Sequence, residues 1–449
     1  MVSQTPIIII GNGIAGITTA RHIRKRSDAP ILIISKESRY FFSRTAMMYV
    51  YMGHLKWEHI QPYENHFWKK NRLDLLEETV TEIDPEKKKL TLSNGNTLSY
   101  ASLVLATGSI PNKFGWPGEN LKGVQGLYSK QDLEKLEALS PSIEEAVIVG
   151  GGLIGIELAE MLQVRGKKVT FLVREKSFWS NVLPKGESQM INRHILSHGI
   201  DLRLATSLSE IIEDENGRAK AIRTDKDEII PCQFVGLTAG VRPNIDFIKD
   251  SSIDTNRGIL VNKYLETNLP DIYAIGDCAE QQEPVPGRRP IEAVWYTGRM
   301  MGETLAKTLT GEKSAYHPGQ WFNSAKFFDI EYQTYGLVAA HPTEPEIHFQ
   351  WENPAKNLGI TIAFNKETNE FIGINTFGIR MRHEIFDQML TEKRTVLHVV
   401  EHLNDCNFDP EFCTSYGGEI IAKFNQEFGT NIRLKKKSWR RIFANLITN

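Results

Sequence analysis

Two glycine-rich loops of the same kind, lying far apart in the chain, constrain its fold more than any other feature. The first is Gly11-Asn-Gly13-Ile-Ala-Gly16, which follows the apolar run Ile7–Ile10. The second is Gly150-Gly-Gly152-Leu-Ile-Gly155, which follows the apolar run at 146–149. Glycines at these positions permit a tight turn and the close approach of a pyrophosphate, whose charge the following helix N-terminus stabilises. A single loop of this kind could be a Rossmann-like turn that binds no nucleotide. This alternative is weaker when two loops occur in the same context, so the pair predicts two dinucleotide sites.

Each loop stands in a repeat of strand, turn, helix and strand, which indicates a doubly wound parallel sheet of the α/β class. Around the first loop we expect a strand at 7–10, a helix over 14–26 and a strand at 31–34. Around the second we expect a strand at 146–149, a helix over 154–164 and a strand at 169–173. Further predictions are a hairpin of 89–92 and 97–98 around Asn94-Gly95, strands at 103–105, 201–204, 229–231, 234–237 and 272–275, and a helix over 292–309.

The pattern changes beyond about residue 320, where we expect a separate α+β domain. Strands at 360–364 and 372–376 flank a turn at 369–370, and a helical stretch covers 384–403. The segment 432–449 differs again, because it carries six lysines and arginines and no acidic residue. It could be an amphipathic helix that lies on an anionic membrane or docks an acidic carrier. We favour the alternative, a terminal helix packed on its own domain.

Composition excludes several classes of protein. The net charge of −2 does not suit a general nucleic-acid binder, and no apolar run approaches the roughly 20 residues of a membrane span. The run at 7–10 is too short for a signal-peptide core, so we expect a cytoplasmic protein. The four cysteines have neither C-x-x-C nor zinc spacing, which predicts no disulfide scaffold and no metal site.

Three further motifs follow in a characteristic order: Leu105-Ala-Thr-Gly108-Ser-Ile-Pro111, Ala239-Gly240-Val-Arg242-Pro243-Asn244 and Tyr273-Ala-Ile-Gly276-Asp277. With the two loops, they make residues 1–320 resemble the flavoprotein reductases with two dinucleotide-binding domains, the pyridine nucleotide-disulfide oxidoreductase superfamily. The resemblance implies two Rossmann-like domains, one inserted in the other, plus the C-terminal α+β domain. The implied bounds are 1–112 with 245–320 for FAD, 113–244 for NAD(P)H, 321–431 for the α+β interface domain and 432–449 for the basic tail.

The same resemblance assigns residues to the two cofactors. Those implied for FAD are Gly11, Gly13, Ile14, Ala15, Gly16, Ala106, Thr107, Gly108, Gly240, Gly276, Asp277, Trp295 and Tyr296, and those implied for NAD(P)H are Gly150, Gly152, Leu153, Ile154 and Gly155. Asp277 would hold the ribityl chain or the adjacent phosphate, although a helix N-cap is an alternative role. Trp295 and Tyr296 would begin a helix aimed at the isoalloxazine, or could equally be core packing.

Two charged residues are the candidates for catalysis. Glu157 matches a family glutamate near the flavin–nicotinamide stack, with a solvated helix carboxylate as the alternative. The segment Glu37-Ser-Arg-Tyr-Phe-Phe-Ser-Arg44 resembles the aromatic-x-Arg segment of nitrite reductase large subunits and of rubredoxin or ferredoxin reductases. This makes Arg44 a candidate flavin-site residue, with a surface cation as the alternative. Tyr49 stands where those reductases often have a lysine.

The ribose-binding positions depart from the family pattern. Ser35 and Lys36 stand where a carboxylate would meet the adenosine ribose of FAD, so we assign that role to Glu37, the nearest carboxylate. After the strand at 169–173 come Arg174 and Glu175. An arginine there suits the 2′-phosphate of NADPH whereas a glutamate suits NADH, and the balance favours NADPH slightly.

No cysteine lies between residues 36 and 54, where the disulfide reductases carry their redox thiols. The resemblance therefore implies an FAD-dependent NAD(P)H oxidoreductase whose electrons leave directly from the flavin. An iron–sulfur or rubredoxin-type carrier is the favoured acceptor. A membrane quinone and a mainly partner-binding or redox-sensing flavoprotein remain alternatives. Residues 324–336 are similar to the start of the family's interface domain, which implies a homodimer.

Overall fold

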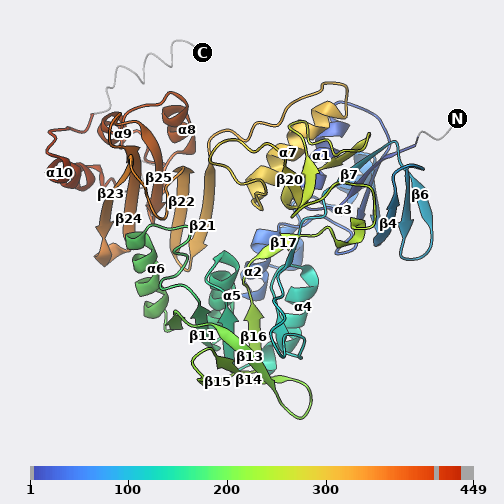
Figure 1. The fold of residues 1–449 in the computed structure, drawn as a ribbon, viewed down its shortest axis with the longest axis horizontal. Coiled ribbons are helices and arrows are strands. Elements are labelled where there is room, and N and C mark those ends of the chain that lie inside the picture. The colour runs from blue at the N-terminus through green and yellow to red at the C-terminus, as the bar shows by residue number, and fades with distance from the viewer. Residues whose placement is uncertain (1–4, 409–413, 436–449) are drawn as a thin grey trace. The chain divides into compact units, whose positions relative to one another are not determined.

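In the computed structural model, which describes residues 5–408 and 414–435, the chain forms two compact units (Figure 1). The first unit comprises the residues up to Arg174 together with Thr206–Pro318. The second comprises Glu175–Ala205 together with the residues from Gly319 onward. The predicted domain bounds are drawn by function rather than by compactness, and they stay a prediction.

A parallel sheet in the order β19-β7-β1-β2-β3 forms one half of the first unit. Its strands are β1 (Ile7–Ile10), β2 (Ile31–Ser35), β3 (Leu73–Glu77), β7 (Ser102–Leu105) and β19 (Ile272–Ala274). Helices α1 (Ile14–Arg24) and α7 (Trp295–Thr308) pack closely on each other, since a Cβ at Gly302 would lie 2.6 Å from the carbonyl oxygen of Ala15. The strands at 7–10, 31–34 and 272–275 and the helices at 14–26 and 292–309 are thus confirmed to within a few residues.

A second parallel sheet forms the other half, with β11, β10, β16 and β9 in that order. These strands are β9 (Val124–Gln125), β10 (Glu145–Val149), β11 (Lys168–Val173) and β16 (Phe234–Leu237), with helices α4 (Lys130–Leu139) and α5 (Leu153–Val164). An antiparallel sheet of β13 (Leu208–Glu213), β14 (Ala219–Thr224) and β15 (Ile229–Pro231) belongs to the same half. The two repeats of strand, glycine turn and helix therefore build two Rossmann-like sheets, as predicted.

The chain crosses between these two halves twice, and the crossing segments pair with each other. They are β8 (Ser109–Pro111) and β17 (Val241–Pro243), which are antiparallel. This pairing fits the expectation that one dinucleotide domain is inserted in the other. The first half also contains α2 (Met47–Tyr51), α3 (Asn65–Lys70), the meander β4 (Val80–Asp84), β5 (Lys89–Leu92) and β6 (Thr97–Ser99), and the pair β18 (Ile259–Val261) and β20 (Ala279–Gln281).

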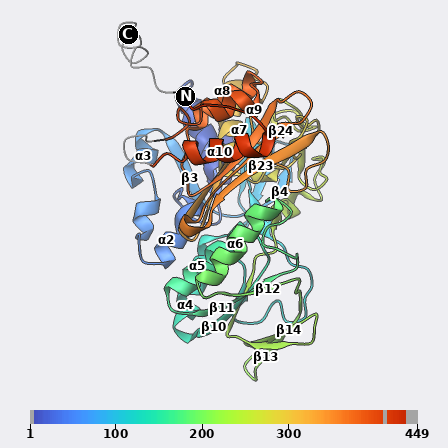
Figure 2. The same ribbon diagram turned by 90° about the vertical axis from the view of Figure 1, so that its left-hand side faces the viewer.

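The second unit contains an antiparallel sheet in the order β21-β22-β25-β24-β23 (Figure 1), and Figure 2 gives a second view of its strands β23 and β24. The strands of this sheet are β21 (Phe322–Phe327), β22 (Ile330–Gly336), β23 (Glu346–Asn353), β24 (Leu358–Asn365) and β25 (Phe371–Phe377). The unit also contains the helices α8 (His383–Thr391), α9 (Val396–Glu401) and α10 (Gly417–Phe428), together with α6 (Lys185–Ser197) and β12 (Asp201–Leu204) from earlier in the chain. Aromatic contacts join sheet and helices, with Phe349 of β23 5.1 Å from Phe424 of α10 between ring centroids. The predicted α+β domain is confirmed.

One helix prediction was too long. The stretch at 384–403 is two helices rather than one, because Lys393 has a left-handed φ of +50° between α8 and α9. Thr395 then caps α9 by accepting a hydrogen bond from the His398 amide at 3.3 Å. Within the described residues no helix is long and apolar enough to cross a bilayer. Most of the predicted basic tail, residues 436–449, lies outside them.

Candidate functional site

The first glycine loop fits a pyrophosphate because its three glycines meet three different demands. Gly11 has a φ of +111°, and a Cβ there would lie 2.1 Å from the carbonyl oxygen of Ala106. A Cβ at Gly16 would lie 2.1 Å from the carbonyl oxygen of Gly11, so α1 packs tightly on the loop. Gly13, the N-cap of α1, faces open space with no heavy atom within 4 Å of a Cβ. The first turn of α1 carries no acidic residue, which leaves its N-terminus available to an anion.

The second loop repeats this arrangement. Gly150 has a φ of +119°, and its Cβ would lie 2.7 Å from the backbone of Thr238. A Cβ at Gly155 would lie 2.4 Å from the carbonyl oxygen of Gly150. Gly152, the N-cap of α5, again faces open space, and the first turn of α5 carries no acidic residue. Leu153 and Ile154 begin α5 here, as Ile14 and Ala15 begin α1 in the first loop.

Asp277 lies in the turn after β19 and is part of a half-buried polar cluster. Its carboxylate accepts a hydrogen bond from the Ser109 hydroxyl at 3.1 Å, and the Ser109 amide donates to the Tyr128 hydroxyl at 3.0 Å. Burial raises the pKa of Asp277, against the lowering effect of Ser109 and of the Arg44 charge. Burial also raises the pKa of Tyr128 to about 12. Because Ile275 is the N-cap of this 3₁₀ turn, Asp277 is not serving as a helix N-cap.

Arg44 is bound in place by its neighbours. Its guanidinium donates two hydrogen bonds to the Glu37 carboxylate, at 2.8 and 2.6 Å, and a third to the carbonyl oxygen of Tyr128. It also lies over the Tyr128 ring, 4.5 Å from the centroid. Burial would lower the pKa of Arg44, but hydrogen bonding and charge from Glu37 raise it overall. Arg44 is therefore a fixed cation rather than a solvated surface residue.

This arrangement bears on Glu37. Its carboxylate pairs with Arg44 through both oxygens and also accepts a hydrogen bond from the Lys130 amide at 2.9 Å. The role of Glu37 at the adenosine ribose stays a prediction, and what the structure adds is that Glu37 positions Arg44. Tyr128 contacts Arg44 and is linked to Asp277 by Ser109, which donates a hydrogen bond to each of them. The sequence did not point to Tyr128, because no motif surrounds it.

The Ala106-Thr107-Gly108 segment is tied to the return crossing. The Thr107 hydroxyl donates to the carbonyl oxygen of Asn244 at 2.8 Å, and the backbone N–H of Asn244 donates to the carbonyl oxygen of Gly108 at 2.9 Å. Two glycines near these segments have positive φ, +87° at Gly240 and +71° at Gly276. These contacts fix the two crossing segments against each other next to the first loop.

The remaining predicted residues are placed as follows. Glu157 is half-buried in the second turn of α5. Trp295 and Tyr296 begin α7, with their rings edge to face at 5.4 Å between centroids. Arg174 is exposed at the end of β11, and Glu175 is half-buried. The roles assigned to these residues stay predictions.

The cysteines that the structure describes are unsuited to redox relay. Cys232, Cys278 and Cys406 are all buried and free. Burial raises the pKa of Cys232 and of Cys406 to about 12, and it also raises the pKa of Cys278. The reactive thiolate is therefore suppressed at all three positions.

Comparison with known proteins establishes the family. Residues 5–302, which contain both glycine loops and the three ordered motifs, match the profile of the pyridine nucleotide-disulphide oxidoreductases. The chain belongs to this family. It is accordingly an FAD-dependent NAD(P)H oxidoreductase of the ferredoxin/rubredoxin reductase branch. The residues that the structure describes contain no disulfide cysteine pair.

Two curated relatives of this family show similar extents of likeness. The 5,5'-dehydrodivanillate O-demethylase ferredoxin reductase subunit of Sphingobium sp. is 30% identical over 339 residues, covering 74% of this chain and 82% of that protein. The rubredoxin-NAD(+) reductase of Acinetobacter baylyi is 32% identical over 321 residues, covering 70% of this chain and 80% of that protein. The crystal structure of the ferredoxin reductase for the CYP199A2 system of Rhodopseudomonas palustris has a TM-score of 0.78 at 22% identity, covering 93% of this chain and 99% of that one. That likeness shows the shared fold.

Proposed function

We propose that this oxidoreductase binds FAD at the first glycine loop and NAD(P)H at the second, and passes electrons to a small iron–sulfur or rubredoxin-type carrier protein. The observation that carries the proposal is the open space at Gly13 and Gly152, each at the start of a helix without acidic residues in its first turn. The names of the Sphingobium and Acinetobacter relatives support the class of acceptor.

The chain's own residues would bind and orient both cofactors. Backbone amides at the starts of α1 and α5 bind the two pyrophosphates. Asp277, whose carboxylate already accepts from Ser109, would hold a hydroxyl of FAD, and Arg44 would present a fixed positive charge in the same cluster. When bound, FAD supplies the hydride and electron transfer chemistry, which the protein tunes through these charges. Glu157 is the candidate residue beside the nicotinamide.

An external carrier suits this chain because none of the cysteines that the structure describes is suited to act as a relay. Residues 36–54 contain no cysteine, and the thiol of Cys278, the described cysteine next to Asp277, donates to the carbonyl oxygens of Leu105 and Ile275. Electrons would therefore leave bound FAD directly rather than through a thiol of this segment. We propose NADPH as the slightly preferred donor, on account of Arg174, and a homodimer as the assembly.

The FAD site is tested by Gly13→Val. Gly13 has an ordinary φ of −69°, and no protein atom lies within 4 Å of an added Cβ, so the substitution leaves the fold intact. It should nevertheless exclude the pyrophosphate, and the purified variant should lack the yellow flavin absorbance after reconstitution with FAD. Gly418→Ala is the matched control, since Gly418 also faces open space but lies on α10. A yellow Gly13→Val protein would contradict the proposal.

Gly152→Val separates the two sites. This variant should retain FAD, but anaerobic bleaching of the flavin by NADH or NADPH should slow at least about tenfold, the effect of about 1.4 kcal/mol of lost binding. The parent, reduced with each nicotinamide, is then reoxidised with rubredoxin, a [2Fe–2S] ferredoxin, a quinone or oxygen. Fast reoxidation by a carrier protein supports the proposed acceptor. Fast reoxidation by quinone or oxygen alone would contradict it.

A further inference from the structure

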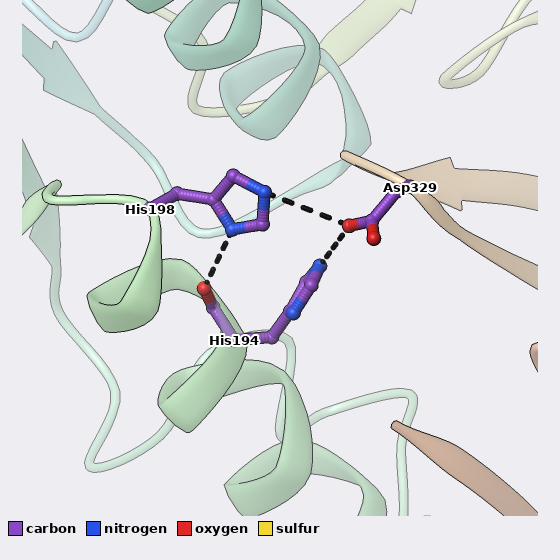
Figure 3. Close-up of side chains that lie close together, drawn as sticks. All are labelled: His194, His198 and Asp329. Carbon is purple, nitrogen blue, oxygen red and sulfur yellow. Dashed lines mark hydrogen bonds and ion pairs between the residues drawn. The ribbon is translucent and has the colours of Figure 1, made fainter. Parts of the chain in front are cut away.

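Three side chains of the second unit that no cofactor role uses converge on one point (Figure 3). His194 and His198 lie one turn apart on or just after α6, and Asp329 lies in the turn between β21 and β22. Asp329 Oδ1 is 2.7 Å from His194 Nε2 and 3.5 Å from His198 Nε2. One ligand atom from each residue falls within 4.8 Å of the other two.

The two histidines are held ready to bind a cation. His198 Nδ1 lies 2.9 Å from the carbonyl oxygen of His194, and because a carbonyl can only accept, Nδ1 carries the proton. In the neutral ring Nε2 therefore presents its lone pair, and Figure 3 shows it directed toward Asp329. His194 is 3% exposed. Its Nε2 lies 2.7 Å from Asp329 Oδ1, and its ring also interacts with the Phe327 backbone.

Packing fixes the orientation of both rings. The His198 ring stacks on Phe328 at 4.2 Å between centroids, with an interplanar angle of 17°. The His194 ring stands edge to face with His198 at 4.4 Å. Phe328 itself has a φ of +55°, which places it at the tip of the same turn that carries Asp329. A rigid helix and a constrained turn thus bring the ligand atoms together before any metal arrives.

We propose that His194, His198 and Asp329 bind a divalent transition metal, with Zn²⁺ as the best match. Two imidazoles at i and i+4 of a helix plus one carboxylate form a nitrogen-and-oxygen set that suits Zn²⁺. Ligand atoms about 2.1 Å from tetrahedral zinc lie roughly 3.4 Å apart. The 3.5 Å spacing meets this, and the 2.7 Å spacing needs only a small rotation of Asp329, whose side chain is 74% exposed. That exposure leaves the fourth position to water.

A second histidine pair in the same unit provides a contrast. His398 and His402 also lie at i and i+4, near Glu401. There, however, His402 Nε2 is 3.4 Å from the Lys435 ammonium, and a cation already faces the ring nitrogen that a metal would need. Helix α9 is also shorter than α6, at six residues against 13. This second cluster therefore serves as the internal control.

A bound metal would join α6 to the turn between β21 and β22. These elements come from the two separate stretches of chain, 175–205 and 319 onward, that make up the second unit. Among the described strands, no sheet pairing connects these two stretches of chain. A metal held by His194, His198 and Asp329 would therefore act as a structural cross-link between them. Binding should therefore raise the melting temperature of the protein.

The test is a Zn²⁺ titration of the full-length, FAD-loaded protein after chelator treatment and desalting. Calorimetry should give one strong site per chain, and Co²⁺ in place of Zn²⁺ should give the visible absorption of a four-coordinate ion. Asp329→Asn and His198→Gln should each weaken Zn²⁺ binding by about 100-fold. Loss of a residue that only supports a ligand costs up to about this much, so loss of a direct ligand should cost no less. Zn²⁺ should raise the melting temperature of the parent but of neither variant.

His402→Gln is the matched control and should bind Zn²⁺ as the parent does. Asp329→Asn carries the test, because Asp329 is exposed and its substitution leaves the buried packing of His194 in place. Equal Zn²⁺ affinity in the parent and in Asp329→Asn would overturn the proposal. So would the absence of a saturable site, or a loss of binding in His402→Gln with none in His198→Gln.

Discussion

The buried carboxyl of Glu187 makes the stability of the second unit depend on pH in an unusual direction. Glu187 lies in the first turn of α6 and is 2% exposed. One carboxyl oxygen accepts a hydrogen bond from Asn375 at 2.9 Å, and the other has no hydrogen-bond partner among the described residues. Burial raises the pKa of Glu187 to about 7, against the lowering effect of Thr361 and Asn375.

The sign and size of the effect follow from this pKa. Folded Glu187 keeps its proton up to about pH 7, whereas the unfolded chain releases it near 4.5. The native state therefore binds more protons across this window, and stability falls as the pH rises through it. The difference between about 7 and 4.5 corresponds to about 3 kcal/mol, which is fully lost above the folded pKa.

Glu187→Gln removes this dependence, because the amide has the shape of the protonated acid and stays neutral at every pH. The variant should match the parent near pH 4, below the unfolded pKa, and be more stable by up to about 3 kcal/mol near pH 8. Urea unfolding followed by tryptophan fluorescence should show its midpoint about 1–2 M higher at the upper pH. Glu367→Gln, at an exposed turn position, should leave the parent's pH dependence unchanged. Equal midpoints of Glu187→Gln and the parent near pH 8 would refute the reasoning.

Three further predictions concern the first unit and the thiols. A double-mutant cycle of Arg44→Ala and Glu37→Ala should give a coupling energy of about 1.5–3 kcal/mol in thermal unfolding, whereas additive effects would contradict the bidentate pair. Arg165→Ala should cost about 1 kcal/mol, read as a lower melting temperature, because its guanidinium bonds a carbonyl of α2 and a carboxylate of α4. Cys232 and Cys406 should resist alkylation near pH 8 in the native protein and react after unfolding, as mapped by peptide mass analysis.

The two Rossmann-like sheets and the loops at their edges could be predicted from local sequence alone. In each loop the tight turn, the glycine that faces open space and the start of the helix lie within six consecutive residues. Their roles can therefore be predicted without knowing what surrounds them. Gly11 and Gly150 adopt the positive φ that the motif requires, and Gly13 and Gly152 face open space. Local hydrophobic runs likewise located the predicted strands to within one or two residues, whereas others, such as β3, β13, β14 and β23, were not predicted.

Which distant side chains meet could not be predicted from the sequence and became visible in the folded chain. Tyr128 joins Arg44 and Asp277 although no motif surrounds it, and Glu37 turns out to hold Arg44 through both oxygens. The convergence of His194, His198 and Asp329 is another case, because cysteine spacing says nothing about where histidines meet a carboxylate. His194 and Asp329 are 135 positions apart and come within 2.7 Å only when α6 packs on the C-terminal sheet. Such contacts depend on burial and packing of whole elements, which local sequence does not encode.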